Sequence, residues 1–161
     1  MLKNCKSIAV DADSIHRKIC SVLLNLCMNK NYELVFVADR PLKQIQSIKD
    51  KNKLNIRIIR VKQGENSADD WIVRYSSDFL CVITHDIPLA KRIVEKGGMV
   101  IDERGTLITE ENASYLLSER DYMTKLREYG LYEKTTSCPI TDQDVKKFAD
   151  TLNMIILKNE Q

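Results

Sequence analysis

The chain has 161 residues, of which 43% are hydrophobic and 30% are charged, and its formal net charge is +2. This composition excludes a wholly disordered protein, and the length leads us to expect that residues 1–161 form a single domain. No apolar run approaches the roughly 18 residues that span a bilayer, and we expect neither membrane insertion nor export. The five cysteines are scattered and odd in number, which favours reduced thiols in a cytoplasmic protein.

Strands and helices are predicted to alternate along the first hundred residues. Short apolar runs that end in polar residues are typical of buried parallel strands, here at 7–10, 34–38, 56–61, 79–84 and 99–101. Helical spacing predicts helices at 15–27, with Ser14 as a candidate N-cap, and at 41–51, 67–75 and 88–95. The alternation predicts an α/β fold of three α/β/α layers with a mostly parallel central sheet.

After Gly105 the pattern changes to a mainly helical extension, residues 106–161, which we expect to pack on the sheet. Residues 110–117 and 120–129 are predicted to be helical, and a last helix is predicted from Thr141 to about Leu157. Thr141 and Asp144 match a capping box at the start of that last helix.

Basic residues gather between residues 40 and 62, although the whole chain is nearly neutral. This window holds eight lysines and arginines, among them Arg40 and Lys43, against Asp50 as its one acidic residue, a local excess of +7. Such a stretch fits a polyanionic partner, and an ordinary solvated helix and loop would have the same composition.

Aspartates lie beyond several of the predicted strands at their carboxyl ends, the edge at which α/β sheets bind ligands. Asp11 and Asp13 follow the first strand, and an extended backbone would point both carboxylates to one side, whereas a turn would let Asp13 help to cap the next helix. Asp69 lies in the first turn of the helix after the third strand, and Asp86 follows the fourth strand. We expect these carboxylates to form an acidic pocket that binds a divalent metal ion.

Other residues at this edge are assigned supporting roles. Thr84 would orient a carboxylate or a water, Asp70 fits a capping box with Ser67, and Asp102 is either a further acidic group or part of a turn. Carboxylates with retained waters are the ligands that Mg²⁺ or Mn²⁺ prefers, so one of these ions is the expected cofactor. Zinc is disfavoured, because the two histidines, His16 and His85, form no metal-binding motif.

Several segments of the sequence carry a resemblance to a known family. They are Val10-Asp11-Ala12-Asp13, Arg40-Pro41-Leu42, Ala68-Asp69, Thr84-His85-Asp86-Ile87-Pro88-Leu89-Ala90 and Arg104-Gly105. Together they resemble the bacterial YaiI/YqxD family, which looks like a relative of PIN-domain nucleases. The resemblance implies a PIN-like fold in which Asp11, Asp69 and Asp86 hold metal for phosphodiester hydrolysis. The sequence departs from the family at Ser14-Ile15-His16, where Ala-Cys-Pro is usual, and at Asn66, where Asp is usual.

The leading hypothesis is a metal-dependent nuclease that acts on RNA in preference to DNA. Basic residues would contact the phosphate backbone, namely Arg40, Lys43, Arg104 and Arg120. Nucleic acid is therefore the expected partner, and a homodimer is left open.

Two alternatives belong to other classes of protein. The first is a non-catalytic module that keeps the fold and binds nucleic acid or protein. The second is a phosphatase of the haloacid-dehalogenase type with Asp11 as nucleophile, which would place its final acidic pair after the Ser/Thr strand, whereas Asp69 and Asp70 precede Thr84. A dinucleotide-binding Rossmann enzyme is disfavoured, because no Gly-x-Gly-x-x-Gly follows any strand.

Overall fold

The computed structural model describes residues 5–13, 15–64, 66–131 and 139–161, and it has the predicted α/β fold. Its elements are, in chain order, β1 (Ser7–Asp11), α1 (Arg17–Lys30), β2 (Glu33–Ala38), α2 (Lys43–Asn52), β3 (Ile56–Arg60), α3 (Ser67–Tyr75), a 3-10 helix (Ser76–Asp78), β4 (Cys81–Ile83), α4 (Ile87–Glu95), β5 (Val100–Ile101), β6 (Leu107–Ile108), α5 (Glu110–Glu128) and α6 (Asp142–Asn159).

The sheet formed by the described residues has the strand order β3-β2-β1-β4-β5-β6. All neighbouring strands are parallel except β6, which runs antiparallel to β5. From β1 the chain winds outward through β2 and β3, and it then returns to place β4 on the other side of β1. The carboxyl ends of β1 and β4 therefore form the topological switch point, where open α/β sheets bind their ligands.

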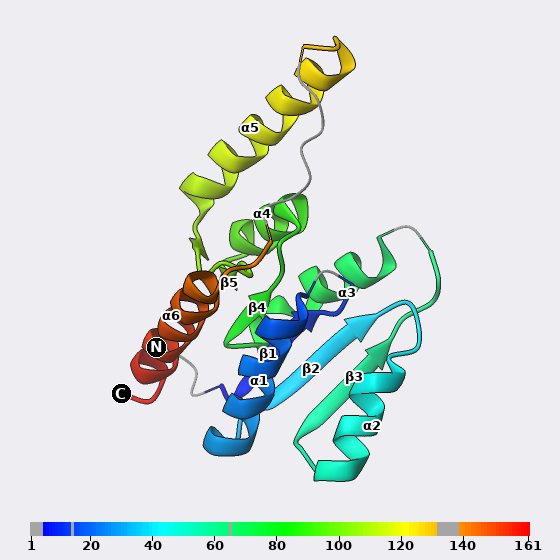
Figure 1. Cartoon of the computed structure of the whole chain (residues 1–161), viewed down its shortest axis with the longest axis vertical. Helices are drawn as coiled ribbons and strands as arrows, with labels where there is room; N and C mark the ends of the chain where they lie inside the picture. Colours follow the sequence, from blue (N-terminus) through cyan, green and yellow to red (C-terminus); the bar gives the residue numbers. More distant parts are fainter. Residues whose placement is uncertain (1–4, 14, 65, 132–138) are drawn as a thin grey trace.

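Helices cover both faces of the sheet and complete three layers (Figure 1). One buried cluster joins the sheet to α1 and α6, and a second joins the opposite face to α3, α4 and the start of α5. The strands serve both clusters because their side chains alternate: Ile8 and Val10 of β1 belong to the first cluster, and Ala9 belongs to the second.

The C-terminal helices contact the body in different ways. α6 packs against α1 and β5, and the side-chain amide of Asn159 donates to the carbonyl of Cys5 at 3.0 Å. α5 contacts α4, buries Ala113 alone among its residues, and then extends away from the sheet (Figure 1). None of the helices in the described ranges is long and apolar enough to cross a membrane.

Some predicted boundaries differ from the structure. α1 begins at Arg17 rather than residue 15, because the His16 ring caps it by accepting a hydrogen bond from the Lys18 backbone at 3.1 Å; Ser14 lies outside the described residues. The two helices predicted at 110–117 and 120–129 are one helix, α5, and the short strand β6 was not predicted. The capping box of Thr141 and Asp144 at the start of α6 is confirmed.

Candidate functional site

A buried carboxylate lies at the switch point, at the last residue of β1. Asp11 has 4% of its surface exposed, and strand alternation puts its side chain on the same face as Ala9, the face that α3 and α4 cover. The buried hydroxyl of Thr84, directly after β4, donates a hydrogen bond to Asp11 Oδ2 at 2.9 Å. This bond joins the ends of the two strands that flank the switch point.

Asp86 is fixed at the same edge by the start of α4. Its Oδ1 accepts a hydrogen bond from the Leu89 backbone at 3.2 Å, so that Asp86 is the N-cap of the helix, with Pro88 in the first turn. The backbone N–H of Asp86 donates to the Thr84 hydroxyl at 3.1 Å. Thr84 therefore links the Asp11 carboxylate to the backbone of Asp86.

Asp69 reaches the site from the first turn of α3. The pKa of its carboxyl is raised to about 6, first by burial and then by the negative charges of Asp86 and Asp11, while the Arg92 guanidinium works against the rise. In the described part of the chain, the Asp69 carboxylate makes no hydrogen bond or ion pair. Three carboxylates on separate elements thus interact electrostatically in one region of the site.

Oxygen donors of this kind are the ligands that Mg²⁺ and Mn²⁺ prefer. Among the described residues, no three His, Cys, Asp or Glu side chains already stand together as a metal-holding group. Asp11 and Asp86 instead accept hydrogen bonds from Thr84 and Leu89. The chemistry of the donor set nevertheless fits a hard divalent cation, because its charge would offset the repulsion that raises the pKa of Asp69.

Asp13 lies beyond the end of β1, because the strand stops at Asp11 and a turn follows. Its carboxylate pairs with Arg40 Nε at 3.1 Å, and both side chains are substantially exposed. The structure therefore places Asp13 beside the first residues after β2. Lys43, the first residue of α2, lies in the same region, whereas Arg120 lies on α5 in the opposite helix layer.

The capping box predicted for Ser67 and Asp70 is wrong. The N-cap of α3 is Asn66, whose backbone is left-handed and whose side chain makes no capping hydrogen bond. Asp70 instead accepts from Arg92 on α4, with 2.8 Å between Oδ1 and Nη2. The pair joins α3 to α4 next to Asp69.

Asp102 forms the turn between β5 and β6, one of the two roles considered for it. Its Oδ1 accepts hydrogen bonds from the backbone of Arg104 at 2.9 Å and of Thr106 at 2.8 Å. Arg104, predicted to contact nucleic acid, pairs with Asp144 Oδ2 at 2.6 Å and so ties this turn to the start of α6.

Sequence reasoning missed Glu103 and Arg92. The Glu103 carboxylate accepts a hydrogen bond from the His16 backbone and pairs with the His85 ring at 3.4 Å, so it joins the start of α1 to the residue before Asp86. Its side chain is only 13% exposed, but in the sequence it stands in a polar run typical of a turn. Arg92 carried no sequence signal, because its position on α4 gives no indication that it reaches Asp70 on α3.

Comparison with known proteins gives a consistent result. A family model described as "Uncharacterized BCR, YaiI/YqxD family" matches residues 9–158. The chain is 38% identical to a UPF0178 protein of Desulfotalea psychrophila, over 94% of this chain and 97% of the relative. It is 36% identical to one of Saccharophagus degradans, over 92% and 94%, and 34% identical to one of Acinetobacter baumannii, over 94% of each. No solved structure matches the chain.

Proposed function

The chain belongs to the YaiI/YqxD family, and from the acidic groups at its switch point we propose that it is a divalent-metal-dependent nuclease that acts on RNA in preference to DNA. The proposal rests on one observation. Asp11, Asp69 and Asp86, delivered by three different elements, lie close enough for the pKa of Asp69 to rise in response to the other two charges. Carboxyl groups with a raised pKa gather at functional sites, and a bound cation would offset the repulsion among these three.

In this proposal Asp11, Asp69 and Asp86 hold the ion, and Asp13 assists from the turn after β1. When bound, Mg²⁺ or Mn²⁺ supplies an acidified water and positive charge for the scissile phosphate. Thr84 positions Asp11 and Asp86 through its hydroxyl. Keeping these groups in place before the substrate arrives lowers the cost of reaching the reactive geometry.

The basic side chains near the site would bind the substrate backbone. Arg40 and Lys43 follow β2, and Arg40 pairs with Asp13. Such contacts are largely independent of sequence, and the affinity that they supply falls as the salt concentration rises.

The proposal is tested by incubating a fluorescently labelled single-stranded RNA with Mn²⁺ and following its cleavage. We expect Asp11→Asn to cleave at least a hundredfold more slowly than the wild type and to retain RNA binding, because it loses a carboxylate of the site and none of the cations. Asp121→Asn, which removes a carboxylate from the exposed part of α5, is the matched control and should cleave like the wild type. Equal cleavage by Asp11→Asn and the wild type would contradict the proposal.

A second candidate is a non-catalytic module that binds nucleic acid. It is favoured by the hydrogen bonds that Asp11 and Asp86 already accept and by Asn66 in place of the usual Asp. RNA binding that is the same in EDTA and in Mn²⁺, with no cleavage in either, would select this candidate over the nuclease.

A further inference from the structure

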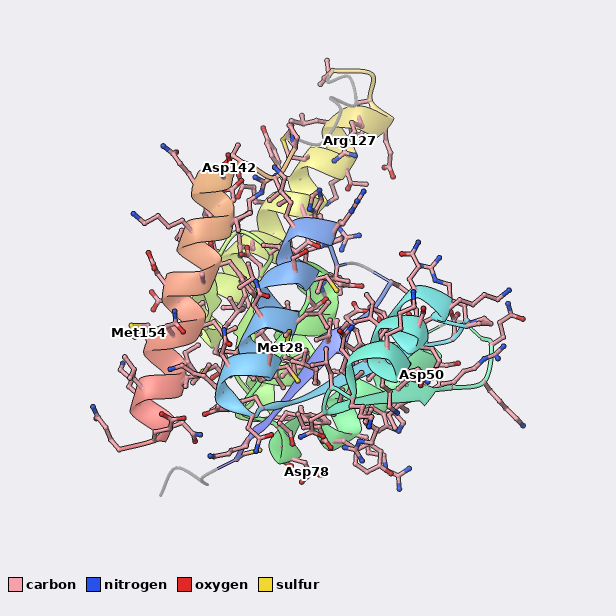
Figure 2. The ribbon with its side chains drawn as sticks, turned by 60° about the horizontal axis from the view of Figure 1, so that its bottom comes forward. Met28, Asp50, Asp78, Arg127, Asp142 and Met154 are labelled. Atoms are coloured by element: carbon pink, nitrogen blue, oxygen red, sulfur yellow. The ribbon has the colours of Figure 1, made fainter. Side chains whose placement is uncertain are left out.

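A cavity of about 640 Å³ opens between α1 and α2, at the carboxyl ends of β1 and β2. Figure 2 shows the two helices next to each other, with Met28 on α1 and Asp50 on α2. The cavity floor is apolar, with Cys20 and Leu24 from α1 and Leu42, Ile45 and Ile48 from the start and body of α2. Its volume lies within the range of about 300–1,000 Å³ that is usual for small-ligand sites.

The rim of this cavity is cationic. Arg17, Arg40 and Lys43 line it, and none of its lining residues is acidic. Asp13, which pairs with Arg40, lies outside the lining. An aliphatic floor under a positive rim fits an amphipathic anion, whose apolar part would leave water while its charge meets the cations.

Two more hollows continue the cavity along α2, and Lys43 lines all three. One of them, of about 580 Å³, reaches Lys51 and Arg60 near the end of β3. Four of the eight basic residues between 40 and 62, namely Arg40, Lys43, Lys51 and Arg60, therefore line a concave surface that begins at the cavity, together with Asp50.

The cavity and the acidic site lie on opposite faces of the sheet at the end of β1. Asp11 belongs to the face covered by α3 and α4, whereas Ala12, the next residue, lines the cavity and packs against the cluster on the opposite face. Both places therefore share the carboxyl end of β1, the edge that a strand of nucleic acid would have to cross to reach both.

We propose that this cavity binds the base and phosphate of a nucleotide next to the scissile phosphate of a single-stranded substrate. The base lies on the aliphatic floor, and the phosphate pairs with Arg17, Arg40 and Lys43. The inference rests on the proposed nuclease function, and it names a nucleotide-binding place for that function. Because any base can lie on an aliphatic floor, binding tolerates different sequences.

The test is a chemical-shift titration of the whole chain with adenosine 5′-monophosphate in EDTA, so that no metal is needed. We expect shifts in α1 and α2, and we expect adenosine and ribose 5-phosphate to bind at least fivefold more weakly, because each carries only one half of the recognised group. Ser21→Trp, which fills the cavity from an exposed position of α1, should weaken binding at least tenfold. Met28→Trp adds the same ring to α1 at a residue that is 60% exposed and outside the cavity, and it should bind like the wild type.

A second pair of variants keeps the test informative if Ser21→Trp folds poorly. Lys43→Ala should weaken binding at least fivefold, whereas Lys49→Ala removes the same charge from α2 outside the three hollows and should leave binding unchanged. Equal binding by Lys43→Ala and Lys49→Ala, or ribose 5-phosphate that binds as well as the nucleotide, would overturn the inference.

Different results would contradict the nuclease proposal and the nucleotide-binding proposal. Nucleotide binding without RNA cleavage in Mn²⁺ would leave the cavity as a nucleotide site and remove the nuclease. Cleavage of RNA by Ser21→Trp with the KM of the wild type would keep the nuclease and remove the cavity from it.

Discussion

Asp69 carries the clearest electrostatic penalty of any single residue at the site. The fold raises its pKa from 3.8 to about 6, through burial first and then through Asp86 and Asp11, so the folded state favours the protonated carboxyl. The stabilisation that this proton provides is present in full below pH 3.8 and is lost as the pH rises through about 6. Without metal, the charged form of Asp69 therefore weakens the fold at neutral pH.

Asp69→Asn should stabilise the metal-free protein at pH 7.5. Allowing for the solvent around a partly buried carboxylate, we expect about 1 kcal/mol, or a rise in Tm of about 2–4 °C. The difference in Tm between Asp69→Asn and the wild type should narrow at pH 5, because the wild-type carboxyl is then largely protonated. Melting curves in EDTA at the two pH values measure it, with Asp121→Asn as the control. A lower Tm for Asp69→Asn at pH 7.5 would refute the electrostatic penalty.

The sequence predicts the positions of some site residues but not the partners of others. The places of Asp11, Asp69 and Asp86 follow from local patterns, because a polar residue after an apolar strand lies at a known edge of the sheet. The partners of Asp70 and Glu103 do not, since Arg92 is 22 residues from Asp70 and His16 is 87 residues from Glu103. Such contacts depend on how the helices pack. The metal-binding role of the aspartates stays a prediction.

The turn between β5 and β6 depends on a glycine that packs directly against α6. Gly105 has a φ of +82°, and a Cβ there would lie 2.5 Å from backbone atoms of Lys147 and Phe148. The Thr151 hydroxyl donates to the Gly105 carbonyl at 2.7 Å. Gly105→Ala should therefore destabilise the protein by about 2–5 kcal/mol, the sum of left-handed strain and a clash with backbone.

Gly97 provides the matched control for this element. Its φ of +85° is similar, but a Cβ there would meet nothing within 4 Å. Gly97→Ala should lower the free energy of unfolding only by the left-handed backbone strain, about 1–2 kcal/mol. Urea denaturation of both variants measures the difference. Equal losses of stability would mean that the contact of Gly105 with α6 contributes nothing.

The elements that the sequence did not predict correctly are those without a local signature. β6 is only 2 residues long, too short to show alternation, and it exists because it pairs with β5. The polar residues between 117 and 120 resemble a break, yet α5 continues through them for its full 19 residues. The α/β alternation of the first hundred residues was predictable, because its strands are short, largely apolar runs and the helices that follow them have an apolar face.

For the molecule as a whole, the proposed metal site predicts stabilisation by the ion. Binding to the folded state alone adds about 2.7 kcal/mol at a concentration one hundred times the Kd, which raises Tm by about 5–10 °C in a domain of this size. We expect this shift with Mn²⁺ for the wild type and for Asp121→Asn, and its loss in Asp11→Asn. A wild-type Tm that does not change over millimolar Mn²⁺ would remove the metal from the proposal.

The central place of β1 has a consequence for how the molecule is made. On one side β1 pairs with β2, its nearest neighbour in sequence, but on the other Ile8 pairs with Cys81, and Asn159 reaches back 154 residues to Cys5. Contacts so distant along the chain form slowly, and during synthesis they must wait for the later residues to leave the ribosome. The acidic site is therefore assembled late, and a nascent chain that ends before β4 carries Asp11 without Thr84 and Asp86 beside it.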